Sequence, residues 1–534
     1  MVAPAPTLIK FETSPNLQQK PLSSLVRKSA LAIFLIANLV VSASALPSLG
    51  DGADISLAAE RRLGDRIARE IYRDPDFLDD PVIADHVQRV WQPLLAAART
   101  RGDLGNEMAE RYAWDILLGR DRTVNAFALP GGYFGLHLGL LAVVGSDDEL
   151  ASVLGHELSH VTQRHISRLM ARQGQIAPWT IGAMILGALA ASKSADAANA
   201  LIVGGQAVSA QSQLNFSRDM EREADRLGFG VMTQAGFDGR GFVGMFDKLQ
   251  QASRLNDNGA YPYLRSHPLT TERIADMQSR QLLDAQASPK APSLSHALVA
   301  ARARVLANPG PDALLAMVRD ADSPDTQAAP PARQAGLFYA AALAGSRLRD
   351  ARAARSAVER LTALVRSDPA AQQLTTWLAV ELSLAADDVT TAARLLEGGA
   401  TFGPTLGPAA WTEPRRPHLM LEAQVALLTG TGLGRLTERL QTWLAAHPRD
   451  AQAWQRLASA YALQGQPLRG LRAEAEAQVA RLDPAGALDR LQAAQDLLRQ
   501  AGGVRGSADH VEASIIDTRR RQLESMLREQ ALER

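Results

Sequence analysis

The stretch His156-Glu157-Leu158-Ser159-His160 is an H-E-x-x-H motif inside a long helical pattern. Residues four apart share one face of an α-helix, so both imidazoles can reach the same metal ion. Glu157 lies next to the first histidine and can act as a general base toward a water molecule at the metal. The motif therefore predicts a hydrolytic metal site with His156 and His160 as ligands.

The residues around the motif predict a buried helix with a defined beginning. Ser146 and Glu149 have the spacing of a capping box, with Ser146 as the N-cap. Apolar residues then recur at helical spacing, at Leu150, Val153, Leu154, Leu158 and Val161. We expect this helix to run from Ser146 to about Arg172.

A catalytic zinc usually has three protein ligands, so a third ligand is needed. Glu221 and Asp225 are four residues apart on a second predicted helix. Glu221 can complete the ligand set, and Asp225 can accept a hydrogen bond from the outer N–H of a ligating histidine. His165 is a weaker candidate, because it follows His156 by nine residues and lies about half a turn off that face. Glu223 is expected to be a solvated charge.

These motifs resemble the zinc gluzincins of the HtpX and CAAX-prenyl-protease class. Beyond H-E-x-x-H, residues 221–225 match an E-x-x-A-D element, and residues 125–133 (NAFALPGGY) resemble the N-A-F-A-x-P-G-G stretch of the class. Residues 267–273 (HPLTTER) resemble its His-Pro element, which is followed by an arginine. The resemblance covers roughly residues 50 to 280. It implies one Zn²⁺ per chain.

The resemblance also implies an α+β, mostly helical protein with a small sheet in a gluzincin metalloprotease domain. An edge strand near Tyr133 to His137 would hold the substrate backbone by β-addition, which suits unfolded proteins. His267 has two possible roles. It could donate a hydrogen bond to the tetrahedral oxyanion, with Arg273 supporting the site, or it could bind the zinc and block the open position until a client displaces it. The catalytic group would then be Glu157, His267 and Arg273.

Composition limits the possible functions and locations of the chain. It has 534 residues, no cysteine and a formal net charge of +0. This length predicts two or three domains, the missing cysteines exclude a thiol protease, and the charge balance argues against a nucleic-acid partner. Residues 1–45 have the pattern of a secretory signal peptide, with an apolar run from Ala30 to Val41 before an A-x-A site. We therefore expect the periplasm as location, with an uncleaved anchor as the alternative.

No later stretch of about 18 apolar residues is present, so the resemblance points to a soluble periplasmic, BepA-like branch of the class. The Gly/Ala-rich residues 176–209 leave three interpretations open. They could form a core helical hairpin, a lid over the cleft, or a surface for peripheral membrane contact.

The C-terminal half is rich in Ala, Leu and Arg and is predicted to be helical. Several residues match a tetratricopeptide (TPR) repeat, namely Trp454, Leu457, Ala458, Tyr461, Ala477 and Pro484. We expect a signal peptide at 1–45, the zinc metalloprotease domain at 46–285, a linker at 286–300 and an all-α TPR-like helical repeat domain at 301–534. A plain helical bundle is the alternative.

Together these features predict an exported zinc-dependent endopeptidase that degrades misfolded or stalled proteins. The resemblance implies quality control of outer-membrane β-barrel proteins, with unfolded or misassembled proteins as substrates. The repeat domain would bind the outer-membrane assembly machinery. The alternative is a chaperone or scaffold for outer-membrane assembly whose proteolysis is latched or incidental. A non-proteolytic metal-dependent hydrolase is disfavoured by the edge-strand element.

Overall fold

The computed structural model describes residues 55–172, 217–254, 261–283, 292–308, 310–399, 415–500 and 507–532. The expected signal peptide (1–45) and the Gly/Ala-rich segment 176–209 lie outside the described residues. Among the helices that are described, none is long and apolar enough to cross a membrane.

A four-stranded mixed sheet lies in the N-terminal part, in the order β1-β2-β4-β3. The strands are β1 (Phe77–Leu78), β2 (Asp115–Gly119), β3 (Ala126–Leu129) and β4 (Tyr133–His137). β4 pairs in parallel with β2 and antiparallel with β3, and all five of its residues are buried. Because its backbone is paired on both sides, the prediction of an edge strand at Tyr133 to His137 is wrong. The edge strands of the described sheet are β1 and β3, and β3 contacts the motif helix α6 (Asp147–Thr162).

The Pro-Gly-Gly turn joins β3 to β4 through a short 3-10 helix, η1 (Pro130–Gly132). Gly131 and Gly132 both have left-handed backbone conformations, with φ of 73° and 78°. A Cβ atom on Gly132 would lie 2.8 Å from Cβ of Tyr112. A Cβ atom on Gly131 would lie 2.7 Å from Cα of Arg61. Both glycines are therefore required by backbone conformation and by close packing.

Helix α6 begins as the sequence predicts. The Ser146 hydroxyl accepts a hydrogen bond from the Glu149 amide at 3.1 Å, while the Glu149 carboxylate accepts from the Gly145 amide at 2.6 Å. The expected continuation to Arg172 is wrong, because α6 ends at Thr162 and a separate helix, α7 (His165–Arg172), follows. Arg164 between them has a left-handed φ of 53°, which breaks the helix and redirects His165.

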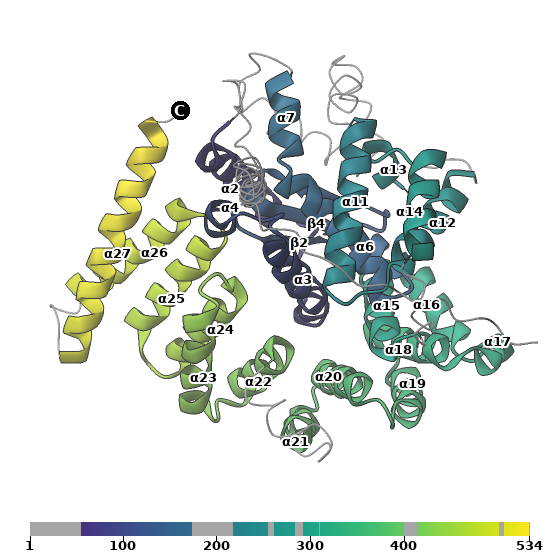
Figure 1. Cartoon of the computed structure of the whole chain (residues 1–534). Helices are drawn as coiled ribbons and strands as arrows, with labels where there is room; N and C mark the ends of the chain where they lie inside the picture. Colours follow the sequence, from purple (N-terminus) through teal and green to yellow (C-terminus); the bar gives the residue numbers. More distant parts are fainter. Residues whose placement is uncertain are drawn as a thin grey trace, which may run out of the picture. The chain divides into compact units, whose positions relative to one another are not determined.

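The remaining helices of the N-terminal part surround the sheet and α6 (Figure 1). They are α2 (Leu57–Arg73), α3 (Pro81–Arg101), α4 (Asn106–Arg111), α5 (Leu138–Val143), α11 (Arg218–Gln234), α12 (Arg240–Arg254), α13 (Tyr263–Ser266) and α14 (Thr271–Leu283). Helices α6 and α11 approach closely at Gly155 and Gly228. A Cβ on Gly228 would lie 2.9 Å from the carbonyl carbon of Gly155, so both positions must stay small for these two helices to meet.

The C-terminal part is entirely helical over its described residues, which confirms the predicted mostly helical α+β class. Its helices are α15 (Leu294–Ala307), α16 (Pro311–Asp320), α17 (Pro324–Ala328), α18 (Pro331–Arg347), α19 (Ala351–Leu364), α20 (Pro369–Ala385), α21 (Val389–Gly399), α22 (Arg416–Thr429), α23 (Leu433–Ala446), α24 (Ala451–Leu463), α25 (Pro467–Ala480), α26 (Pro484–Gln500) and α27 (Ser507–Leu532). Helices consecutive in sequence pack on one another, as α24 and α25 do. The assignment to TPR repeats stays a prediction.

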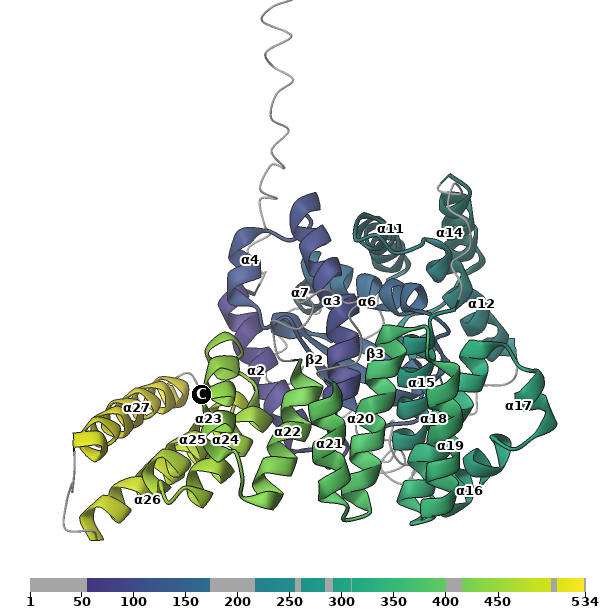
Figure 2. The same ribbon diagram turned by 90° about the horizontal axis from the view of Figure 1, so that it is seen from below.

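The first C-terminal helix, α15, packs directly on the N-terminal part, against α5 and α3. On its other side it packs against α18, which Figure 2 shows next to it. Leu298 and Val299 are buried in the same hydrophobic cluster as Trp91 of α3 and Leu154 of α6. The C-terminal bound of the linker expected at 286–300 is therefore wrong, because residues from Leu294 onward belong to the buried helix α15. Residues Ile55–Arg534 make up a single compact unit.

A buried ion network joins α15 to both parts of the chain. Arg302 donates to Asp80, the N-cap of α3, at 2.7 Å and to Glu381 of α20 at 2.8 Å. Its side chain is only 7% exposed, and the neighbouring acids raise its pKa above the ordinary value against the effect of burial.

We expect the substitution Arg302→Ala to lower the free energy of unfolding by about 3–5 kcal/mol, because it leaves two carboxylates without their cation. Chemical denaturation of the full chain measures this. Arg304→Ala on the same helix is the control, since Arg304 is exposed and its removal should change stability by less than about 0.5 kcal/mol. Equal effects of the two substitutions would contradict the role of the network.

Candidate metal centre and active site

Four side chains with metal-binding atoms meet between α6, α11 and the turn after α13. They are His156, His160, Glu221 and His267, and their ligand atoms all lie within 4.8 Å of one another. The Nε2 atoms of the two motif histidines are 2.9 Å apart, and Glu221 Oε1 is 3.4 Å from Nε2 of His160. Each of the four is at most 1% exposed. The two helices thus bring together the three ligands expected from sequence, and His267 joins them.

The pKa shifts of His160 and Glu221 suit a metal ion. Burial lowers the pKa of His160 well below its ordinary value, which favours the neutral imidazole. Burial alone would raise the pKa of Glu221, but the charge of His267 and hydrogen bonds from His160 and His267 lower it well below the usual range. Neutral imidazoles and an ionised carboxylate are the forms that bind a metal ion.

Glu157 lies at the edge of this cluster with its carboxylate buried. Both of its oxygens lack a hydrogen-bond partner among the described residues, and Oε1 lies 3.4 Å from Nε2 of His267. A buried carboxylate without a donor costs free energy, so this side chain has a free capacity to accept a proton or a water molecule. Together with the donor set of two imidazoles and a carboxylate, this arrangement fits a metal ion of the zinc type.

Asp225 and Arg273 contact two of the expected ligands, His156 and Glu221. Asp225 Oδ1 is 2.9 Å from Nδ1 of His156, which leaves Nε2 of that histidine facing the cluster. Arg273 binds both oxygens of Asp225, at 2.6 and 2.7 Å, and reaches Oε2 of Glu221 at 2.7 Å. Arg273 is therefore placed to orient the two carboxylates rather than to contact a reacting group.

Residues 86–281 match the model of peptidase family M48. The chain carries an M48 peptidase domain. The match includes all the residues just described, from the two motif histidines to Arg273.

Several relatives with assigned names share this domain. The chain is 36% identical over 267 residues to the putative beta-barrel assembly-enhancing protease of Vibrio cholerae, covering 49% of the chain and 52% of that protein. It is 31% identical over 241 residues to the beta-barrel assembly-enhancing protease of Escherichia coli, covering 45% and 47%. It is 26% identical over 196 residues to the mitochondrial metalloendopeptidase OMA1 of Saccharomyces cerevisiae, covering 36% and 54%. The chain thus spans about half the length of these relatives.

The M48 domain contains a second set of supporting contacts that the sequence interpretation missed. His165 places Nδ1 2.8 Å from Nδ1 of His160 and Nε2 3.0 Å from Glu223. Arg168 also donates to Glu223, at 3.0 Å. His165 thus lies beside the outer nitrogen of His160 instead of in the ligand cluster, and Glu223 is more than a solvated charge. The helix break at Arg164 creates this contact, and helical periodicity cannot predict it.

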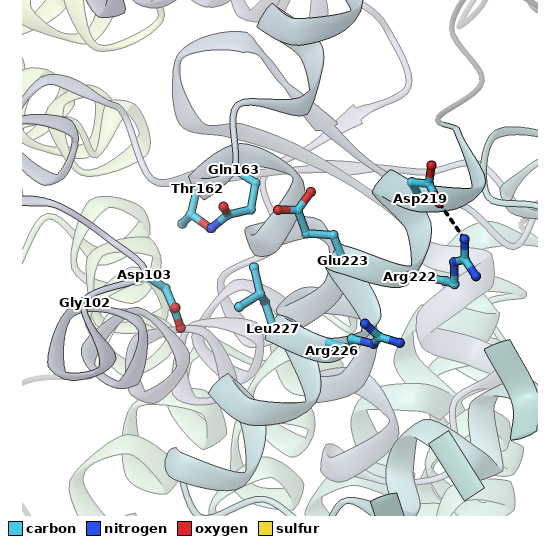
Figure 3. A pocket seen from close by; sticks show the side chains of 9 residues that line it. All are labelled: Gly102, Asp103, Thr162, Gln163, Asp219, Arg222, Glu223, Arg226 and Leu227. Carbon is cyan, nitrogen blue, oxygen red and sulfur yellow. Dashed lines mark hydrogen bonds and ion pairs between the residues drawn. The ribbon is translucent and has the colours of Figure 1, made fainter. Parts of the chain in front are cut away.

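Glu223 lines a surface pocket of about 890 Å³ between the end of α6 and α11. Figure 3 shows its carboxylate turned toward Thr162 and Gln163, while Asp219 and Arg222 pair with each other further along the wall. The Glu223 side chain is 39% exposed. It can therefore be replaced without opening the core.

We expect Glu223→Ala to weaken metal binding by about 10–100-fold, because His165 loses the acceptor that fixes its ring against His160. Competition with a chromophoric chelator measures the dissociation constant. Asp219→Ala in the same pocket is the matched control and should leave it unchanged. Equal affinities for wild type and Glu223→Ala would show that this chain of contacts does not orient the ligand.

Tyr263 was also missed by the sequence interpretation. Its ring stacks on His267 with a centroid distance of 4.6 Å, and its carbonyl accepts the His267 amide at 2.9 Å. Tyr263 therefore fixes the orientation of His267 toward the ligand cluster. A lone aromatic residue in a short helix gives no sequence signal for such a role.

Proposed function

We propose that the chain is an exported zinc metalloendopeptidase that degrades misfolded or stalled proteins during the assembly of outer-membrane β-barrel proteins. The observation that carries this proposal is the closeness of His156, His160 and Glu221 to one another beside Glu157, whose buried carboxylate has no hydrogen-bond partner among the described residues. The names of the M48 relatives support the substrate class, and the expected signal peptide supports a periplasmic location.

In the proposed reaction His156, His160 and Glu221 would hold the zinc ion. When bound, the ion would supply a Lewis acid that polarises the scissile carbonyl and acidifies water. Glu157 takes a proton from the attacking water and later transfers it to the leaving amine. Asp225 and Arg273 keep the ligands oriented. The low exposure of the cluster excludes bulk water and strengthens these electrostatic interactions.

The edge strand β3 is the proposed binding site for substrate backbone. Among the described residues β3 pairs only with β4, and it contacts α6, which carries the motif. An extended client chain can add to the open side through main-chain hydrogen bonds, with little dependence on side-chain identity. This mode of binding fits an enzyme that acts on unfolded proteins.

The direct test is cleavage of casein by the purified full-length chain before and after removal of metal. We expect cleavage to stop after dialysis against a chelator and to return when Zn²⁺ is added in equimolar amount. Glu157→Gln protein carried through the same cycle is the control for a contaminating protease. Undiminished cleavage in the chelator would reject the metallopeptidase.

A second function is favoured by the position of His267. Its Nδ1 lies 3.0 Å from Glu221 and 3.3 Å from Nε2 of His156, inside the ligand cluster. A histidine at this point would occupy the fourth position of a tetrahedral zinc and latch the enzyme until a client displaces it. In the latched state the chain would act as a chaperone or scaffold for outer-membrane assembly.

The helical C-terminal part is the proposed docking element for the outer-membrane assembly machinery. Successive helix pairs offer an extended surface that does not take part in the chemistry. Because α15 is buried against the M48 domain, this part cannot be removed at residue 285 without exposing the core. Its role is therefore best tested by surface substitutions in the full chain. The proposed membrane contact through 176–209 rests on composition alone.

A further inference from the structure

A second cluster of metal-binding side chains lies at the opposite end of α6 from His160. It consists of His86 on α3, Asp147 at the first position of α6, and His296 on α15. Asp147 Oδ1 is 2.9 Å from Nε2 of His86 and 2.8 Å from Nδ1 of His296. Asp147 precedes His156 by nine residues, which is about 13 Å along a helix, so the cluster is a separate site.

The hydrogen bonds of His296 require a cation between its ring and Asp147. Nε2 lies 3.0 Å from the carbonyl oxygen of Val144, which can only accept, so the proton of a neutral ring must be on Nε2. Nδ1 then presents a lone pair toward the carboxylate of Asp147, which is also an acceptor. Either a second proton or a metal ion must lie between them. Donation of the outer N–H to a backbone carbonyl is the usual arrangement of a metal-ligating histidine.

His86 is the third possible ligand of this cluster. Its Nε2 is buried, lies 2.9 Å from Oδ1 of Asp147 and makes no hydrogen bond of regular geometry with the described residues. Nε2 of His86, Oδ1 of Asp147 and Nδ1 of His296 are thus close enough together to bind one ion.

One contact must change when a metal ion binds His86 through Nε2. Arg89 Nη2 lies 3.0 Å from Nδ1, which would then carry the proton. The Arg89 side chain is 42% exposed, and its Nε lies 3.6 Å from Asp85. Arg89 can therefore turn toward Asp85 and solvent.

We propose that His86, Asp147 and His296 bind a second zinc ion, with a structural role. Two imidazoles and one carboxylate are a common zinc ligand set, and the side chain of Asp147, which is 34% exposed, leaves room for water as the fourth ligand. The ion ties α15, the first helix of the C-terminal part, to α3 and to the beginning of the motif helix. It would thus fix the C-terminal part relative to the catalytic motif. This site does not depend on the proposed function.

Zinc analysis of the full-length chain after exhaustive dialysis tests the proposal. We expect two ions per chain in wild type, one in Asp147→Asn, and one in His296→Gln. The exposed His510→Gln is the matched control and should keep two. His160→Ala should lose only the other ion, and the double variant His160→Ala/Asp147→Asn should hold none. Because each variant removes the ligands of one site only, the counts test the second site and the M48 site independently.

A thermal readout covers the case in which the buried histidine variants do not fold. Asp147→Asn changes a partly exposed side chain, so it should fold. The melting temperature of the His160→Ala protein should rise on addition of Zn²⁺, and that rise should be absent from the double variant. If the wild-type chain holds a single zinc ion, and Asp147→Asn still holds it, the proposal is overturned. A proton, and not a metal ion, then lies between His296 and Asp147.

Discussion

The substitution Glu157→Gln is expected to abolish nearly all cleavage of unfolded protein while leaving the metal and the fold in place. The side chain is 1% exposed and neither oxygen has a hydrogen-bond partner among the described residues, so glutamine fits the same space without breaking a hydrogen bond. An amide cannot take a proton from water. General-base catalysis contributes about 10²–10⁴-fold, so kcat/KM should fall by that factor.

A fluorogenic casein assay at equal zinc content measures the effect. Glu107→Gln on α4 is the matched control, because its side chain is 68% exposed and lies outside the cluster. That variant should have wild-type kcat/KM. If Glu157→Gln protein turns over casein at the wild-type rate, Glu157 is not the proton acceptor.

The substitution His267→Ala distinguishes the two roles of that histidine by the sign of its effect. If His267 is the latch, its removal opens the fourth position and raises basal proteolysis, with self-cleavage as a visible consequence. If it donates to the oxyanion, its removal costs roughly 10²–10³ in kcat. The short contacts of Nδ1 with Glu221 and His156 favour the latch, and we expect activity to rise.

Zinc content must be measured in the same samples, because a lost ligand can also lower the affinity for the metal. Tyr263→Leu provides a second test of the latch. It removes the ring that stacks on His267 but keeps the histidine. A latch held in place by that ring should be partly released, so Tyr263→Leu should also raise basal cleavage. Reduced cleavage by both variants at full zinc content would reject the latch.

Local geometry explains which features the sequence could predict. His156 and His160 converge because helix spacing is local, and Ser146 caps its helix for the same reason. The approach of Glu221 to that helix depends on the close contact of Gly155 and Gly228. The sequence indicated Glu221 by its spacing to Asp225, and the class resemblance agreed, but neither shows the contact of the two helices.

Other features depend on contacts between distant segments. The break at Arg164 requires a left-handed residue that is not glycine, and composition gives no sign of it. Strand order is likewise not local, so β4 was taken for the edge strand although β2 pairs with it. The burial of α15 follows from partners such as Asp80, more than 200 positions earlier in the chain. The apolar pattern of α15 alone cannot identify those partners.

Anomalous X-ray scattering at the zinc absorption edge, from crystals of the wild-type chain, tests the central claim most directly. The account predicts a peak about 2.0–2.2 Å from Nε2 of His156, Nε2 of His160 and an oxygen of Glu221, with His267 as the fourth neighbour. A zinc-loaded chain with no anomalous peak among these side chains would contradict it.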